Sequence, residues 1–134
     1  MFLGAILSLA ATGCGPGGPA FHPVRVTLAV PAGDVAALAG STVDIAVDGD
    51  HSKRASGTIG ADGRAELETL HAGRIRRGVQ EGKYRARIVL SDDDREAHRK
   101  AAKAVPAKYL DFKTSGLTVT VPEAAEITLT LTSK

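Results

Sequence analysis

Apolar and polar residues alternate along most of this chain, as they do in β-strands that bury one face. Clear alternation covers residues 24–30, 43–47, 84–90, 117–121 and 127–131. Two weaker runs, 55–59 and 64–67, flank a glycine-rich turn at 60–63 that predicts a hairpin. These seven short strands predict an all-β fold, a single seven-stranded antiparallel β-sandwich.

Residues 91–104 break the alternation and predict a short helix or a loop. Ser91 is a suitable N-cap, acidic residues fill the first turn, and basic residues fill the last turn. Glu96 and Lys100 are spaced for an ion pair on a helix. Pro106 disfavours helix at the preceding residue, so the element should end there. Its apolar positions are alanines, so we expect a weakly packed, exposed element.

Residues 68–81 form the second break in the pattern. Three arginines fall here, namely Arg74, Arg76 and Arg77. We expect a surface loop. Together with 91–113, the segment 68–80 is a candidate binding surface for a small ligand or a glycan.

The N-terminal residues predict export and a lipid anchor. Residues 2–11 are apolar and uncharged, but a bilayer span needs about 20 residues, so the run fits a secretory signal instead. The sequence at 11–14 resembles the lipobox of bacterial lipoproteins, in which the cysteine receives diacylglycerol. Cys14 is therefore the predicted lipid-attachment residue, although Ala11 stands where that motif usually has leucine. The alternative is a signal cleaved near Ala11, with Cys14 a free thiol.

These features divide the chain into a signal peptide at 1–13, a flexible Gly/Pro tether at 14–23 and a sandwich domain at 24–134. Cys14 is the single cysteine, so no intrachain disulfide is possible and the fold depends on its core. The net charge of +2 gives no broad attraction to nucleic acid. The absence of tryptophan argues against a stacked sugar cleft.

No set of residues predicts a metal site, a cofactor site or a catalytic centre. The histidines are scattered without a zinc spacing, at His22, His51, His71 and His98. Three aspartates lie around the turn at Gly49 and could offer oxygens to Ca²⁺, but a solvated hairpin explains them better: Asp44, Asp48 and Asp50. Asp94 and His98 predict a solvated pair. No serine-hydrolase, zinc-protease or P-loop motif occurs, so we expect no enzyme activity. A hydrolase using aspartate or histidine on the loops is the least favoured alternative.

Two segments resemble a known family. Residues 57–67 together with 82–86 resemble the carboxypeptidase regulatory-like or transthyretin-like domain, and 105–121 resembles small bacterial envelope lipoproteins built on it. Phe112 departs from that pattern, which usually has proline. The resemblance implies a β-sandwich in the cell envelope and no established catalytic position.

The residues of these motifs also predict a structural corner. We expect Tyr84 in the core with a corner hydrogen bond, and Tyr109 over the sandwich edge with its hydroxyl in water. Thr114 and Ser115 offer hydroxyl groups to the backbone of a turn. The functional expectation is a non-enzymatic, membrane-anchored envelope lipoprotein. Its domain lies in the periplasm or at the cell surface, where it meets a protein partner or, alternatively, a small ligand or glycan.

Overall fold

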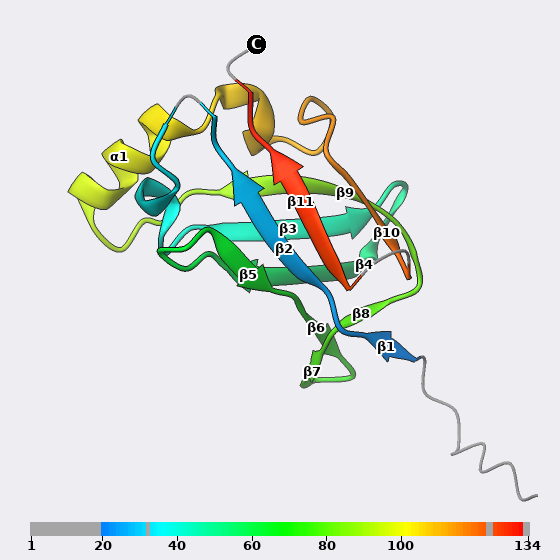
Figure 1. The fold of residues 1–134 in the computed structure, drawn as a ribbon. Helices are drawn as coiled ribbons and strands as arrows, with labels where there is room; N and C mark the ends of the chain where they lie inside the picture. Colours follow the sequence, from blue (N-terminus) through cyan, green and yellow to red (C-terminus); the bar gives the residue numbers. More distant parts are fainter. Residues whose placement is uncertain (1–19, 32, 123–124, 133–134) are drawn as a thin grey trace, which may run out of the picture.

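The computed structural model describes residues 20–31, 33–122 and 125–132. In this part of the chain, strands dominate, and two sheets pack face to face as the alternation predicts (Figure 1). All seven predicted strands are present, and the all-β sandwich is confirmed. The described residues form eleven strands rather than seven.

The larger sheet has the strand order β10-β9-β3-β4-β6-β7. Its strands are β3 (Thr42–Val47), β4 (Asp50–Thr58), β6 (Glu68–His71), β7 (Arg74–Arg77), β9 (Gly82–Val89) and β10 (Thr118–Val121). At its centre, β3 pairs antiparallel with β4 on one side and with β9 on the other. The predicted Asp-Gly turn joins β3 to β4, so that hairpin is confirmed.

The smaller sheet has the order β11-β2-β5, with β2 (Arg25–Ala29), β5 (Arg64–Glu66) and β11 (Glu126–Thr130). A separate two-stranded sheet pairs β1 (Phe21–His22) with β8 (Val79–Gln80). β11 runs parallel to β2, so the expectation of a purely antiparallel fold is wrong in this place. These two strands come from distant parts of the sequence, and no hairpin fixes their relative direction.

The turn at 60–63 does not form the predicted hairpin. β4 pairs with β3 and β6, whereas β5 pairs with β2, so the turn carries the chain from one sheet to the other. Gly57 makes this crossing possible, because a Cβ there would collide with the carbonyl of Glu66. The turn chemistry predicted a reversal of direction correctly, but not which strands would pair after it.

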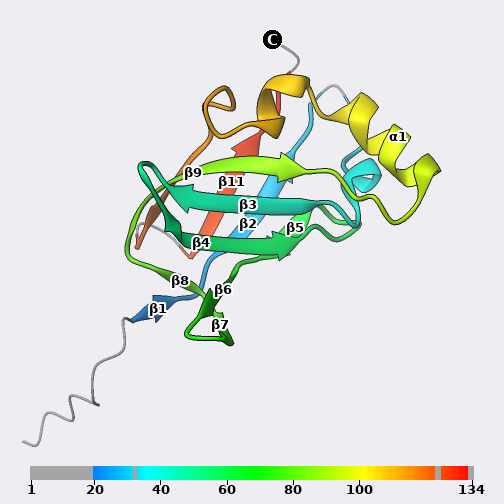
Figure 2. The same cartoon turned by 180° about the vertical axis from the view of Figure 1, so that it is seen from behind.

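The core lies between the two main sheets and consists of the residues that alternate in the sequence (Figure 2). Val26, Val43 and Ile45 are completely buried. The same cluster includes aliphatic residues from every strand of the predicted series. Burial of these side chains is the main force that holds the sheets together.

The predicted helix or loop at 91–104 is a helix, α1 (Arg95–Ala104), which ends at Val105 as Pro106 predicted. Its N-cap is Asp94 rather than Ser91, since the Asp94 carboxylate accepts the backbone N–H of Glu96 at 3.1 Å. Two short 3-10 helices accompany it, η1 (Val35–Leu38) and η2 (Ala107–Leu110). α1 packs on η1 and buries Ala101.

The expectation of a surface loop at 68–81 is wrong, since the segment forms the β6–β7 hairpin and strand β8. Every residue of β7 is exposed, so solvent lies on both of its faces. A strand with two wet faces has no reason to alternate, and the pattern therefore failed to reveal it.

Candidate functional site

The outer face of the larger sheet holds a buried carboxylate between two arginines. Val43 and Ile45 point into the core, so Asp44 between them points outward. Arg87 on β9 lies directly opposite Asp44 in the register and binds its Oδ2 through Nε at 3.1 Å. Arg54 on β4 binds the same oxygen from the other side. Only 8% of the Asp44 side chain is exposed.

Phe112 lies against the two arginines of this group. Its ring lies 4.6 Å from the guanidinium carbon of Arg87 and 6.0 Å from that of Arg54, which is cation–π geometry. The loop that carries Phe112 is fixed on both sides. Asp111 accepts the backbone N–H of Lys113 at 2.9 Å, and the Ser115 hydroxyl donates to the carbonyl of Ala86 at 2.6 Å. We call Asp44, Arg54, Arg87 and Phe112 the arginine cluster.

The arginine cluster carries an excess of positive charge, because one carboxylate faces two guanidinium groups. Arg54 is 46% exposed and Arg87 33% exposed, so both offer N–H groups to solvent. These groups border a shallow depression of about 460 Å³. Other residues that line it are Thr42, Ser56, Glu68, Leu70 and Val89. The Glu68 carboxylate belongs to the same lining, so the depression as a whole holds two guanidinium groups and two carboxylates. Each guanidinium can bind a carboxylate ligand with two hydrogen bonds.

The three aspartates considered for Ca²⁺ do not converge. Asp44 belongs to the arginine cluster, Asp48 pairs with Arg85 at 3.1 Å, and Asp50 accepts the backbone N–H of Ser52 at 3.2 Å. Across residues 20–31, 33–122 and 125–132, no three histidine, cysteine or acidic residues are grouped to hold a metal ion. The aspartates therefore act as partners of arginines and of backbone.

The histidines are separate as well. His98 contacts Asp92 at 3.3 Å and the carbonyl of Ser91 at 3.0 Å. The predicted Asp94–His98 pair is therefore wrong, because Asp94 caps the helix instead. His71 lies edge-on to Phe21, with 5.7 Å between ring centroids.

The two tyrosines have contrasting environments. Tyr84 is in the core and donates from its hydroxyl to the carbonyl of Gln80 at 2.7 Å, which confirms the corner bond. Burial raises the pKa of Tyr84 above its usual 10.0. Tyr109 is also buried, so the expectation of a wet hydroxyl is wrong.

The Tyr109 hydroxyl is held by the segment after β11. It lies 3.1 Å from the Thr132 hydroxyl and accepts the Thr132 backbone N–H at 2.9 Å. Burial by itself raises the pKa of Tyr109. The hydrogen bonds from Thr132 and the nearby Lys108 ammonium outweigh burial and bring that pKa below 10.0. Thr114 and Ser115 use their hydroxyl groups for backbone bonds as predicted.

The two segments suggested for ligand binding lie apart over most of their length, although Glu68 and Leu70 of the first line the depression beside the arginine cluster. α1 and the β6–β7 hairpin lie at opposite ends of the molecule in both views (Figures 1 and 2). The end of the second segment, at Phe112, does reach the sheet and completes the arginine cluster. The sequence analysis missed this cluster. Two features of the sequence could have indicated the cluster. One is an aromatic residue, Phe112, in a polar loop, and the other is an aspartate, Asp44, within an apolar strand.

Comparisons with protein-family models, with curated proteins and with solved structures found no match. The family resemblance of the two motifs therefore stays a prediction. None of the helices among the described residues has the length and apolar character to cross a membrane. Cys14 and the predicted signal lie outside the described residues, so their roles also stay predictions.

Proposed function

We propose that this chain is a non-enzymatic, lipid-anchored protein of the cell envelope that binds a partner on the outer face of its larger sheet. Cys14, at the end of the apolar run, is the proposed attachment residue. The domain would face the periplasm or the cell exterior. The binding role rests on the arginine cluster, where the two partly exposed guanidinium groups of Arg54 and Arg87 share the one buried carboxylate of Asp44.

The chemistry of this surface favours an acidic segment of another envelope protein. A carboxylate could bind Arg54 and Arg87 together, with an adjoining aliphatic side chain against Val89. Both arginines are already oriented by Asp44 and Phe112, so little side-chain entropy is lost on binding. Oriented donors of this kind give specificity for carboxylate over other acceptors.

The anchor is tested on the full-length chain in a bacterial host. Wild-type protein should fractionate with membranes and should accumulate as a precursor when lipoprotein signal processing is inhibited by globomycin. Cys14→Ser should enter the soluble fraction or stay unprocessed. Unchanged processing and unchanged membrane association of this variant would contradict the anchor.

The binding surface is tested with a panel of acidic peptides and their amidated counterparts, in which Asn and Gln replace Asp and Glu. Binding should require the carboxylates and should fall about tenfold or more in Arg54→Gln, because a charge-assisted hydrogen bond is lost. Arg64→Gln on β5 is the matched control, since Arg64 is exposed on the other sheet. Circular dichroism checks that each variant is folded.

A carboxylated-glycan panel is run beside the peptides. Selective binding of glycans would favour the ligand-binding alternative over a protein partner. Equal losses in Arg54→Gln and Arg64→Gln would show a non-specific charge effect and would contradict the assigned site.

A further inference from the structure

The β6–β7 hairpin exposes two large aliphatic side chains. Leu70 is 71% exposed and Ile75 is 70% exposed. They are cross-strand partners in the register, so they form one apolar patch at the edge of the larger sheet. Val89, the next most exposed large aliphatic residue described, is only 41% exposed. A contiguous exposed apolar pair of this kind is a candidate contact surface.

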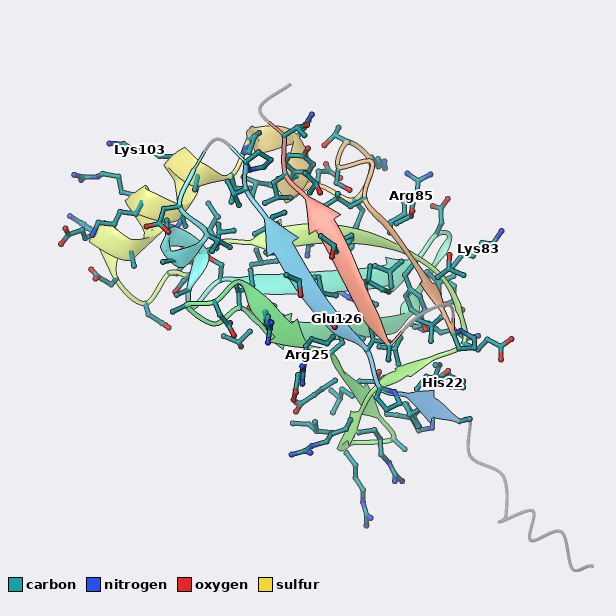
Figure 3. All side chains as sticks on the ribbon, viewed as in Figure 1. His22, Arg25, Lys83, Arg85, Lys103 and Glu126 are labelled. Atoms are coloured by element: carbon teal, nitrogen blue, oxygen red, sulfur yellow. The ribbon has the colours of Figure 1, made fainter. Side chains whose placement is uncertain are left out.

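Three arginines lie on the strand that carries Ile75. Arg74, Arg76 and Arg77 are all exposed on β7, and none of the three has an ion-pair partner among the described residues. Figure 3 shows nitrogen-tipped side chains that project from this end of the molecule. His71 lies on the same hairpin, opposite Arg74. Arg77 shares the face of Ile75 and lies opposite Glu68 in the register, whereas Arg74 and Arg76 project from the other face of the strand. Two apolar side chains beside these cations on one short hairpin suit an anionic lipid surface, where acyl chains lie beneath phosphate groups.

The hairpin is also next to the point where the chain enters the domain. β1 pairs with β8 and contacts β7. Gly78 brings the two segments together, because a Cβ there would lie 2.6 Å from the His22 carbonyl oxygen. The chain from Cys14 to Phe21 spans at most about 25 Å when fully extended. A lipid on Cys14 would therefore hold the hairpin close to the membrane.

We propose that the β6–β7 hairpin is a second membrane contact, which places Leu70 and Ile75 at the acyl boundary and the three arginines among lipid phosphates. The inference rests on the proposed lipid anchor, which specifies the membrane. The contact fixes the orientation of the domain, with α1 and η2 at the end away from the lipid (Figure 1). Neither the lipid nor the hairpin needs to hold the protein alone, since two weak contacts on one chain reinforce each other.

The hairpin is tested without the lipid in a chain of residues 20–134. This fragment should fold by itself, because the core of the described residues lies between Val24 and Leu131. Sedimentation is measured with phosphatidylcholine vesicles that contain or lack phosphatidylglycerol. The fragment should bind the anionic vesicles selectively, and this binding should weaken as the salt concentration rises. Absence of that preference would overturn the proposal.

Variants assign the contact. Arg74→Gln, Arg76→Gln and Arg77→Gln together should weaken binding about fivefold for each arginine, or roughly 100-fold in all. Leu70→Ser with Ile75→Ser should also weaken it. The matched control removes three cations from α1, with Arg95→Gln, Arg99→Gln and Lys103→Gln, and should bind as wild type. Equal losses in the control would overturn the proposal.

Ile75→Trp gives a direct readout, because the chain has no tryptophan of its own. Its fluorescence should shift to the blue and be quenched by brominated lipid. A blue shift that depends on protein concentration without vesicles would indicate a second copy of the chain as the occupant. That result would overturn the membrane contact.

Failure of the hairpin and failure of the anchor give different results in the full-length protein. Without lipidation, the protein keeps only the weak, salt-sensitive binding of the hairpin, and a substituted hairpin then releases it from the membrane fraction completely. If only the hairpin inference fails, the protein stays in the membrane fraction and trypsin cleaves at Arg74–Arg77 equally fast with and without detergent. Protection of these sites in membranes, lost in the Leu70→Ser and Ile75→Ser variant, is the expected result.

Discussion

Two strands of the same sheet carry similar sequences and occupy opposite environments. β9 contains Arg85-Ala86-Arg87-Ile88, and β7 reads Arg74-Ile75-Arg76-Arg77. Ile88 is 1% exposed, whereas Ile75 is 70% exposed. Arg87 has Asp44 and Phe112 as partners, and the arginines of β7 extend into solvent.

The difference comes from the neighbours of each strand rather than from its own residues. β9 lies between β3 and β10, and its inner face packs against the smaller sheet. β7 is an edge strand with one partner, β6. Arginine is a common way to keep an edge strand from pairing with other chains. At the centre, the same residue type needs a carboxylate partner because part of its charge is buried.

The largest expected effect distinguishes the two isoleucines. Ile88→Ala should lower the free energy of unfolding by about 2–5 kcal/mol, because it leaves a cavity in the core. Ile75→Ala should change it by about 0.5 kcal/mol or less, since that side chain is already in water. Urea unfolding followed by circular dichroism measures both. Similar losses for the two variants would contradict the contrast between centre and edge.

The next effect concerns the carboxylate that the central arginine requires. Asp44→Asn should cost about 1–3 kcal/mol in unfolding free energy, since two guanidinium groups lose their charged acceptor. Asp48→Asn is the matched control, because the Asp48–Arg85 pair is largely exposed and contributes about 0–1 kcal/mol. Thermal or urea unfolding would reveal the difference, and equal costs would rule out a special role for Asp44.

A smaller effect tests the hydroxyl of Tyr109. Tyr109→Phe removes its hydrogen bonds with Thr132 and should cost about 0.5–1.5 kcal/mol. Amide hydrogen exchange should then quicken at Thr132 before it changes on β3 or β9. Unchanged exchange at Thr132 would show that the hydroxyl does not hold this segment.

The smallest effect is a pH dependence of opposite sign at the two tyrosines. The raised pKa of Tyr84 means that the fold favours its neutral form. Its contribution to the free energy of unfolding is therefore full below pH 10.0 and is lost as pH rises through the folded pKa. The lowered pKa of Tyr109 means that the fold favours its ionised form. Its contribution to the free energy of unfolding therefore grows as pH rises through the folded pKa and is full above pH 10.0.

Ultraviolet titration of phenolate absorbance can separate them, because the chain has only two tyrosines. Tyr84→Phe leaves Tyr109, which should titrate below 10.0, and Tyr109→Phe leaves Tyr84, which should titrate above it. The reverse order would contradict both assignments.

Alternation in the sequence was enough to predict the core strands, since one face of each is buried. A helix at 95–104 was one of two alternatives that the sequence offered, the other being a loop, because its charges and Pro106 mark both ends but its apolar positions are only alanines. Strand β7 was not predictable, because solvent on both faces removes the alternation. The residue that β6 buries is the polar Thr69, so no apolar alternation marks that strand either. The hairpin therefore looked like a loop, although its arginines were noted.

The arginine cluster depends on register, which alternation does not specify. A slip of two residues between β3 and β9 would keep every apolar side chain inward and would still separate Asp44 from Arg87. The contact of Phe112 with Arg54 joins positions far apart in the sequence, as does the bond between Tyr109 and Thr132. Patterns within a short window contain no information on such contacts.

The parallel pairing of β2 with β11 has a mechanical consequence. A load applied between the segment before β1 and the segment after β11 would pull these two strands along their lengths in opposite directions. The backbone bonds from Arg25–Glu126 to Ala29–Thr130 would then bear the force together rather than one after another. The two residue pairs of β1 and β8 would yield first. A domain tethered at its N-terminal side would thus resist being pulled from its other end.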